Sequence, residues 1–176
     1  ADAAAAAEEY ARRNPQSTTG PSYLAWISFY DRGDTGPLRA FLATRPTGWA
    51  EARWNLEMLD RDYPAALSAM DTSTVEVFAD QYSLAPRSLY RGIALRHMGR
   101  EAEATAALEA SLETLKAMIP ELEEDCRLHA ALGENYALLG LREEALQAAG
   151  RAIELMPPER DALVGPYNVI SLAHVY

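Results

Sequence analysis

The chain has 176 residues, of which 49% are hydrophobic and 24% are charged, so it is long enough to bury a substantial core. Its formal net charge of −10 repels phosphate and disfavours nucleic acid as a partner. The single cysteine, Cys126, excludes an internal disulfide and a thiolate metal cluster, and the short, charge-interrupted apolar stretches exclude a transmembrane helix.

Ala1–Arg13 consists of strong helix formers, and the predicted helix ends before Asn14 and Pro15. Acidic residues flank its alanine run and no basic leader precedes it, so this segment is not expected to be a signal peptide. The chain has no initiator methionine and starts inside a helix, so we expect a piece of a longer protein. The lone cysteine favours the cytoplasm and is also compatible with the periplasm.

Four more helices are predicted before residue 72. The first has an apolar stripe formed by Tyr23, Trp26, Ile27 and Tyr30, and a glycine ends it. A proline in the first turn is favourable for the second. The predicted ranges are Pro21–Arg32, Pro37–Ala43, Trp49–Asp60 and Tyr63–Met70.

Thr72–Ser83 has an ambiguous pattern. Val75, Val77 and Phe78 favour a strand, but no second strand is evident to pair with them. A short helix is therefore predicted for this segment.

The clearest pattern lies in Arg127–Pro157. Apolar residues recur at spacings of three and four before and after Gly140, so two amphipathic helices are predicted. Gly140 can adopt the left-handed conformation that ends the first helix, and the final proline stops the second. Gly133 and Ala145 lack bulk, so the helices can cross closely. The apolar positions are Leu128, Leu132, Tyr136 and Leu139, then Ala145, Ala149, Ala152 and Ile153.

A corresponding hairpin precedes this one, with predicted helices Pro86–Met98 and Glu101–Met118, the second interrupted at Pro120. An insertion loop is expected after Pro157, followed by a further first helix, Tyr167–Tyr176, without a partner helix in this chain. Three small residues recur at an offset of 41: Gly92, Gly99 and Ala104 correspond to Gly133, Gly140 and Ala145.

The spacing His129-x-x-Leu132-Gly133-x-x-Tyr136, followed by Ala145, Ala149 and Pro157, resembles the tetratricopeptide repeat, whose period is roughly 34 residues. His129 stands where that pattern has Trp, and Ala149 where it has an aromatic residue. The resemblance implies an all-α fold, a single right-handed α-solenoid over residues 1–176 that is cut at both ends. Its clear repeats are 85–119 and 126–159, with looser helical pairs in 1–84 and the start of a further repeat at 166–176.

Arg127–Gly133 and Arg160–Tyr167, with the pairs Asp62-Tyr63 and Gln81-Tyr82, are similar to the C-terminal repeat regions of bacterial multidomain signalling proteins. In those proteins a cyclase, kinase or winged-helix domain lies upstream of the repeats. The resemblance covers roughly Arg45–Tyr176. It implies a regulatory or partner-docking role within a longer chain and places no catalytic residue here.

No catalytic motif is evident, since a nucleophile elbow, a phosphate-binding glycine loop and HExxH are all missing from the sequence. Cys126 and His129 are one helical turn apart and could supply two metal ligands. No third ligand has a suitable spacing, so we expect a core thiol and a packing imidazole, with no metal and no cofactor. Arg32-Gly33-Asp34 spells an adhesion tripeptide, and we interpret it as an interhelical turn.

Residues 101–125 contain eight acidic side chains and one basic side chain, Lys116. Glu121–Asp125 could attract a cation or a basic partner. A solvated helix start, where acidic side chains complement the helix dipole, is the favoured interpretation.

The resemblance implies a concave groove lined by the first helices of the repeats. Some such repeats grip a peptide carboxylate with Lys, Arg and Asn, but Leu89, Ile93, Ala130 and Glu134 stand at these positions here, so that clamp is absent. A mixed apolar and acidic groove favours a basic or amphipathic helix. Contacts between neighbouring repeats alone are the alternative role of these residues. The predicted groove positions are Tyr23, Ile27, Tyr30, Leu89, Ile93, Arg96, His97, Ala130, Glu134 and Ala137.

The sequence therefore predicts a non-catalytic interaction and scaffolding module of a larger bacterial regulatory or signalling protein. Its expected partner is a protein, a peptide or an upstream domain of the same chain, and neither nucleic acid nor membrane insertion is expected. A structural spacer that forms homo-oligomers through its end helices is the first alternative. An enzyme with an interhelical site is the second, although no convergent titratable groups support it.

Overall fold

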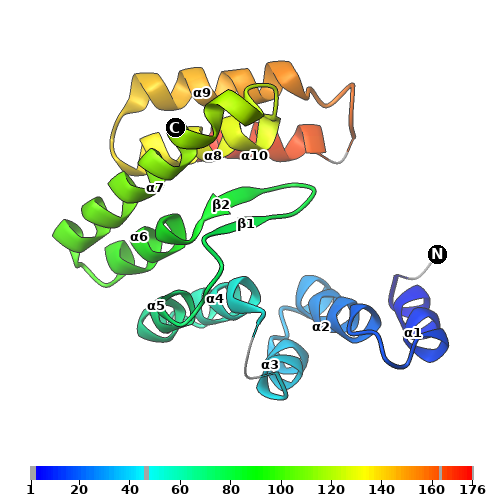
Figure 1. Ribbon diagram of the computed structural model, residues 1–176. Coiled ribbons are helices and arrows are strands. Elements are labelled where there is room, and N and C mark those ends of the chain that lie inside the picture. The colour runs from blue at the N-terminus through cyan, green and yellow to red at the C-terminus, as the bar shows by residue number, and fades with distance from the viewer. Residues whose placement is uncertain (1–2, 46–47, 163, 176) are drawn as a thin grey trace. The chain divides into compact units, whose positions relative to one another are not determined.

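The computed structural model describes residues 3–45, 48–162 and 164–175, which form ten helices and one two-stranded antiparallel sheet (Figure 1). Helices account for 72% of the structure, which is consistent with the predicted all-α class. The chain divides into two compact units, Ala1–Asp62 and Tyr63–Tyr176, where the sequence analysis predicts one domain. Each unit has its own hydrophobic core.

The first unit follows the predicted helix ranges closely. Its described helices are α1 (Ala3–Arg13), α2 (Thr19–Arg32), α3 (Gly36–Ala43) and α4 (Ala50–Leu59). Gly33 ends α2 in a left-handed conformation with φ 67°, and its N–H donates to the carbonyl of Phe29 at 2.7 Å. The carboxylate of Asp34 then accepts a hydrogen bond from the N–H of Gly36, at the start of α3. Arg32-Gly33-Asp34 is therefore an interhelical turn, as predicted.

Small residues bring α1 and α2 together. A Cβ atom on Gly20 would lie 2.7 Å from the Cβ atom of Ala11, so only glycine is compatible with this crossing. The core of the unit lies on the other side of α2, between α2, α3 and α4. Its buried members are Ala25, Leu38, Phe41, Leu42, Ala52 and Leu56.

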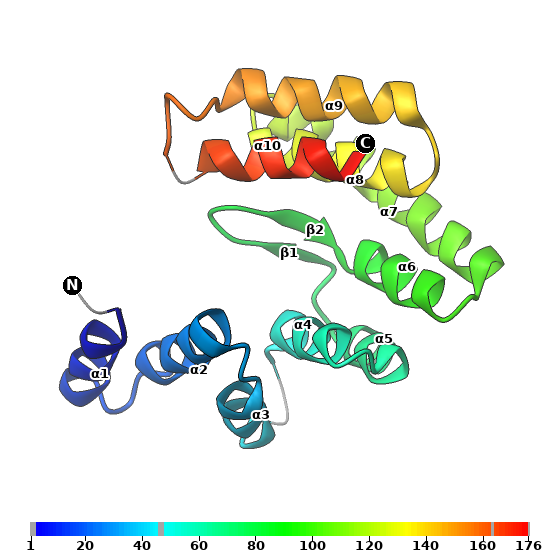
Figure 2. The ribbon, with the colours of Figure 1, turned by 180° about the vertical axis from the view of Figure 1, so that it is seen from behind.

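The second unit contains a β-hairpin among helices. Its elements are α5 (Tyr63–Asp71), β1 (Val77–Ala79), β2 (Leu84–Pro86), α6 (Arg87–His97), α7 (Glu101–Leu122), α8 (Cys126–Leu138), α9 (Arg142–Leu155) and α10 (Val164–Val175). α10 lies beside α8 and α9 and contacts both (Figure 2). This helix begins at Val164, three residues before the predicted Tyr167. It has packing partners within the chain.

The α6–α7 and α8–α9 hairpins cross at equivalent positions. A Cβ atom on Gly133 would lie 3.1 Å from the backbone nitrogen of Ala149 and 3.3 Å from the carbonyl oxygen of Ala145. A Cβ atom on Gly92, 41 residues earlier, would lie 3.4 Å from the carbonyl oxygen of Ala104. The predicted correspondence of the small residues is therefore confirmed in the packing of both hairpins.

Residues 72–83 do not form the predicted helix. Val77 pairs with Pro86, and Ala79 with Leu84, in an antiparallel hairpin, so the strand does have a partner. The carboxylate of Asp80 closes the turn by accepting hydrogen bonds from the backbone N–H groups of Tyr82 and Ser83, both at 2.7 Å. The prediction failed because Leu84–Pro86 reads as the approach to the next helix.

The predicted interruption at Pro120 is also wrong, because α7 continues through it to Leu122. Pro120 is exposed and lies in the last turn, where it removes one backbone hydrogen bond close to the helix end. α7 has 22 residues and α9 has 14. The predicted helix Glu101–Met118 is therefore present and extends four residues further. Strand β2 of the β-hairpin contacts α6, α7 and α8.

We expect Gly133→Val to lower the free energy of unfolding by about 1–3 kcal/mol, because its methyl groups would force α9 away from α8. Gly150 is a matched control on α9, since a Cβ atom there would meet nothing within 4 Å. Gly150→Val should change the free energy of unfolding by less than about 0.5 kcal/mol. Urea denaturation followed by circular dichroism measures both, and equal losses would contradict the close crossing.

Candidate binding surfaces

The predicted groove positions on α6 have different surroundings. Leu89 is only 2% exposed and packs in a core cluster with Ala85 and Leu108, so it is a core residue and faces no groove. Ile93 is half-buried against the same cluster. Arg96 and His97 are exposed, although Arg96 donates to the carbonyl of Leu138 at the end of α8. Of the predicted groove positions on α6, only Arg96 and His97, in its last turn, therefore offer polar groups to a partner.

His97 is further constrained by its neighbour on α5. Its ring stacks on the ring of Tyr63, with centroids 4.8 Å apart and planes inclined by 16°. An ion pair between Arg91 and Asp71 joins the same two helices. These contacts fix α5 against α6, so His97 belongs to an interhelical contact as well as to the surface.

The groove positions on α8 lie together. Ala130, Glu134 and Ala137 follow one another at spacings of four and three, which places them on one helix face, and all three are half-buried. This face carries little bulk, because two of its three residues are alanines. These three predicted positions therefore share a face, and their role in a groove stays a prediction.

The groove positions on α2 also lie on one face, in the first unit. Tyr23 is 59% exposed and Tyr30 is 76% exposed, with Ile27 half-buried between them. The ring of Tyr30 stacks on Trp26 with centroids 6.0 Å apart. The structure thus groups the predicted residues into separate sets on α2, α6 and α8.

The β-hairpin reaches the faces of α8 and α10, which the sequence analysis did not foresee. Arg127, in the first turn of α8, donates to the carbonyl of Asp80 in the hairpin turn. The ring of Tyr82 stacks on Tyr167 of α10, with centroids 5.4 Å apart and planes inclined by 22°. The hairpin turn therefore covers one end of the helical face on which a groove was predicted.

A hollow of about 610 Å³ lies between α8 and α9. His129, Leu132 and Tyr136 line it from α8, and its α9 side includes Gly150 and Arg151. The imidazole Nε2 of His129 lies 2.8 Å from the carbonyl oxygen of Glu123, which fixes the ring at the rim.

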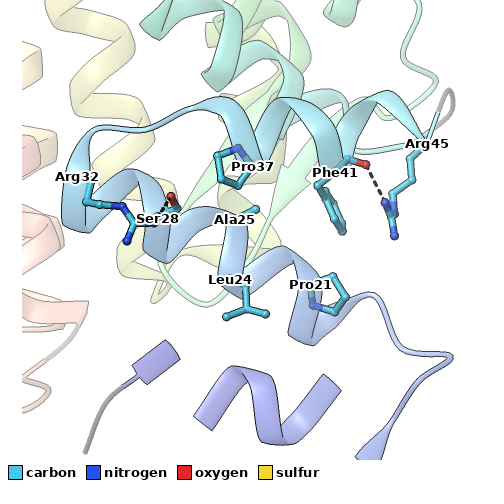
Figure 3. Close-up of a pocket in the computed structure, with 8 residues that line it drawn as sticks. All are labelled: Pro21, Leu24, Ala25, Ser28, Arg32, Pro37, Phe41 and Arg45. Carbon is cyan, nitrogen blue, oxygen red and sulfur yellow. Dashed lines mark hydrogen bonds between the residues drawn. The ribbon is translucent and has the colours of Figure 1, made fainter. Parts of the chain in front are cut away.

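A second hollow, of about 540 Å³, lies between α2 and α3 in the first unit (Figure 3). Its apolar lining includes Leu24, Ala25 and Phe41, and no acidic residue lines it within the described chain. Arg32 and Arg45 stand at opposite ends of the groove. Sequence reasoning missed this groove. Arg32 follows Ser28 by four positions and shares a face of α2 with it, whereas Arg45 lies just beyond the end of α3 and returns to Phe41 through its side chain.

Both arginines are anchored at their own helix ends. Arg32 Nη2 donates to Ser28 Oγ at 2.9 Å, and Arg45 Nη1 donates to the carbonyl of Phe41 at 2.7 Å. The Arg45 guanidinium carbon also lies 3.8 Å from the centroid of the Phe41 ring. The groove is therefore apolar along its length and cationic at each end.

The candidate metal ligands do not assemble into a site. Cys126 is buried, and His129 contacts a backbone carbonyl. Among the described residues, no group of three or more His, Cys, Asp or Glu side chains is placed to hold a metal ion. None of the described helices has both the length and the apolar character needed to cross a bilayer.

Half of the eight acidic side chains in 101–125 form ion pairs or a helix cap, namely Glu103, Glu113, Glu124 and Asp125. Glu103 pairs with Arg100, and Glu124 pairs with Arg151 of α9 at 3.1 Å. Asp125 caps α8 by accepting from the backbone N–H of Arg127 at 2.9 Å. These contacts are those of a solvated helix start.

Comparison with protein-family models, curated proteins and solved structures gives no match for this chain. The resemblance to tetratricopeptide repeats therefore rests on the residues and their spacing, and it stays a prediction.

Asp125 and Arg127 form the strongest electrostatic pair at the start of α8. The two carboxylate oxygens of Asp125 accept from Arg127 Nε at 3.0 Å and Arg127 Nη2 at 2.6 Å. This hydrogen bonding lowers the pKa of Asp125 below its ordinary value, and burial partly opposes it. The ionised carboxylate thus stabilises the fold above the pKa of the unfolded chain, and this stabilisation is lost as the pH falls through the folded-state pKa.

We expect Asp125→Asn to lower the free energy of unfolding by about 1 kcal/mol at neutral pH, because the amide can still cap α8 but carries no charge. The difference from the parent should shrink as the pH falls below about 4. Urea denaturation at a series of pH values measures it. A difference that stays constant down to about pH 3 would contradict the contribution of the charge.

Proposed function

We propose that this chain is a non-catalytic protein-interaction module built from tetratricopeptide-like helical repeats. The observation that carries the proposal is the equivalent crossing of α6–α7 and α8–α9 at Gly92 and Gly133. A repeated supersecondary unit that cannot bury its apolar face alone must stack on its neighbours, which creates an extended face for binding. The second unit is then a short right-handed α-solenoid.

Contacts between each helical hairpin and the next helix support the stacking. Asn135 of α8 is fully buried, and its Nδ2 donates to Ser111 Oγ of α7 at 2.6 Å. Asn168 of α10 is 2% exposed, and its Nδ2 donates to the carbonyl of Ala152 of α9 at 3.1 Å. Ser111 and Ala152 are 41 residues apart, the same offset as the crossing glycines. A buried asparagine of the next helix therefore contacts each hairpin at an equivalent position: α8 contacts α7, and α10 contacts α9.

The charge of the second unit supports a basic partner. Residues 63–176 contain 17 acidic and nine basic side chains. Such a surface attracts positive segments and speeds their encounter. We propose a basic or amphipathic helix as the ligand, bound on the face of α8 that carries Ala130, Glu134 and Ala137. The resemblance to bacterial signalling proteins extends this to a docking role beside an upstream regulatory domain.

The experiment tests whether this face of α8 binds peptides. Amphipathic peptides with basic, neutral or acidic polar faces are selected against the chain from a displayed library, and their affinities are measured by fluorescence anisotropy. Ala130→Arg/Ala137→Arg should weaken the selected basic peptides at least about tenfold, because bulk and positive charge are added on the proposed face. Leu89 is unsuitable for this purpose, since a polar residue there would disrupt the core.

Ala106→Arg/Ala110→Arg is the matched control, because both alanines are exposed on α7 and the change in net charge is the same. Circular dichroism and thermal unfolding must show that both variants are folded. Equal affinities of the two variants would overturn the assignment of this face. Failure to select any peptide, with a molecular mass that rises with concentration, would favour the spacer.

A further inference from the structure

The α2–α3 groove has an arginine at each end, and neither is in an ion pair with a described residue. Arg53, Arg96 and Arg160 also bond backbone carbonyls, but none of them lines this groove. Elsewhere in the described chain, arginines are commonly held by carboxylates. These paired arginines are Arg12, Arg13, Arg39, Arg87, Arg91, Arg100, Arg127 and Arg151. The ion pairs found among the described residues include neither Arg32 nor Arg45.

The two groove arginines bond neutral acceptors instead. Arg32 donates to a serine hydroxyl, and Arg45 donates to the carbonyl of Phe41 and to Thr44 Oγ1, both at 2.7 Å. A guanidinium has five N–H donors, so these contacts orient each side chain and leave further donors for a carboxylate. Two oriented cations at the ends of one apolar groove are an arrangement that a ligand with two separated negative charges would complement.

The groove lining between the two arginines favours apolar parts of a ligand. Ala25 and Phe41 are buried, Leu24 is half-buried and Pro37 is exposed, so the floor and walls offer hydrocarbon surface. A volume of about 540 Å³ is large enough for several aliphatic side chains. A polyphosphate ligand suits the groove poorly, because the apolar floor separates the two cations and the whole chain is acidic.

We propose that the groove between α2 and α3 binds an apolar peptide segment of a partner protein that carries carboxylates at both ends of its apolar stretch. The apolar side chains of the segment lie on Leu24, Ala25 and Phe41, and its carboxylates bond Arg32 and Arg45. This site lies wholly within the first unit. It is independent of the proposed face of α8, and its partner has the opposite charge.

The test uses two labelled synthetic peptides with the same leucine-rich centre, one flanked by glutamates and the other by lysines. Fluorescence anisotropy measures their binding to the full chain and to Arg32→Gln/Arg45→Gln. We expect the glutamate peptide to bind the parent and to lose about tenfold in affinity with the double variant. Its affinity should also fall as salt is raised, because both arginines are accessible to solvent.

Arg61→Gln is the matched control, since Arg61 is an exposed arginine of the same unit that does not line the groove. It should bind the glutamate peptide as the parent does. If the double variant does not fold by circular dichroism, Arg32→Gln alone and the salt dependence supply the test. Arg32 is exposed, so this single variant should weaken binding by up to about fivefold.

Three outcomes would overturn the proposal. Equal binding of the lysine peptide would show that charge does not select the ligand. Equal affinities of the double variant and Arg61→Gln would place the binding outside the groove. Association of the chain with itself that the double variant abolishes would make a second copy the occupant. A loss confined to the groove variants, with binding by the α8 face unchanged, would support this site independently of the proposed function.

Discussion

The close approach of α8 to α9 is the constraint on which the second unit depends. Gly133 brings the two backbones so near that even one methyl group would crowd Ala149 and the carbonyl of Ala145. Alanines at the crossing keep the hairpin thin, so neighbouring helices can reach both of its sides. α7 packs on one side through Ser111 and Asn135, and α10 on the other through Asn168. The helices can stack closely because glycine and alanine at the crossing carry little or no side chain.

The β-hairpin packs where the two helical hairpins of the unit differ in length. α7 is longer than α9 by about two turns, which leaves space beside the start of α8. Val77 and Leu84 fill that space by packing with residues of α7 and α8, including Leu115 and Leu128. Arg127 then ties the hairpin turn to α8. The additional turns of α7 and the β-hairpin therefore pack together beside the start of α8.

Periodicity and turn residues were sufficient to predict most helices, because both act within a few residues of the chain. Gly99 and Gly140 follow the ends of α6 and α8 with φ values of 72° and 77°, in the left-handed region that glycine favours. The failures required knowledge of distant neighbours. Strand β1 pairs with Leu84–Pro86, and Leu89 packs against Leu108 of α7, so both depend on residues later in the chain.

The same limit applied to the candidate sites. The predicted face of α8 could be found from spacing, since Ala130, Glu134 and Ala137 are on one helix. The α2–α3 groove joins residues of two helices, and its significance depends on which arginines have carboxylate partners, which a sequence does not reveal.

Charge then separates the two candidate surfaces. The second unit has almost twice as many acidic as basic side chains, whereas the first has nine acidic and seven basic. A basic helix is attracted to the former, while the unpaired guanidinium donors of the α2–α3 groove attract carboxylates. Each proposed surface would therefore repel the ligand proposed for the other. Under the two proposals, the chain offers a basic segment and an acidic segment separate surfaces.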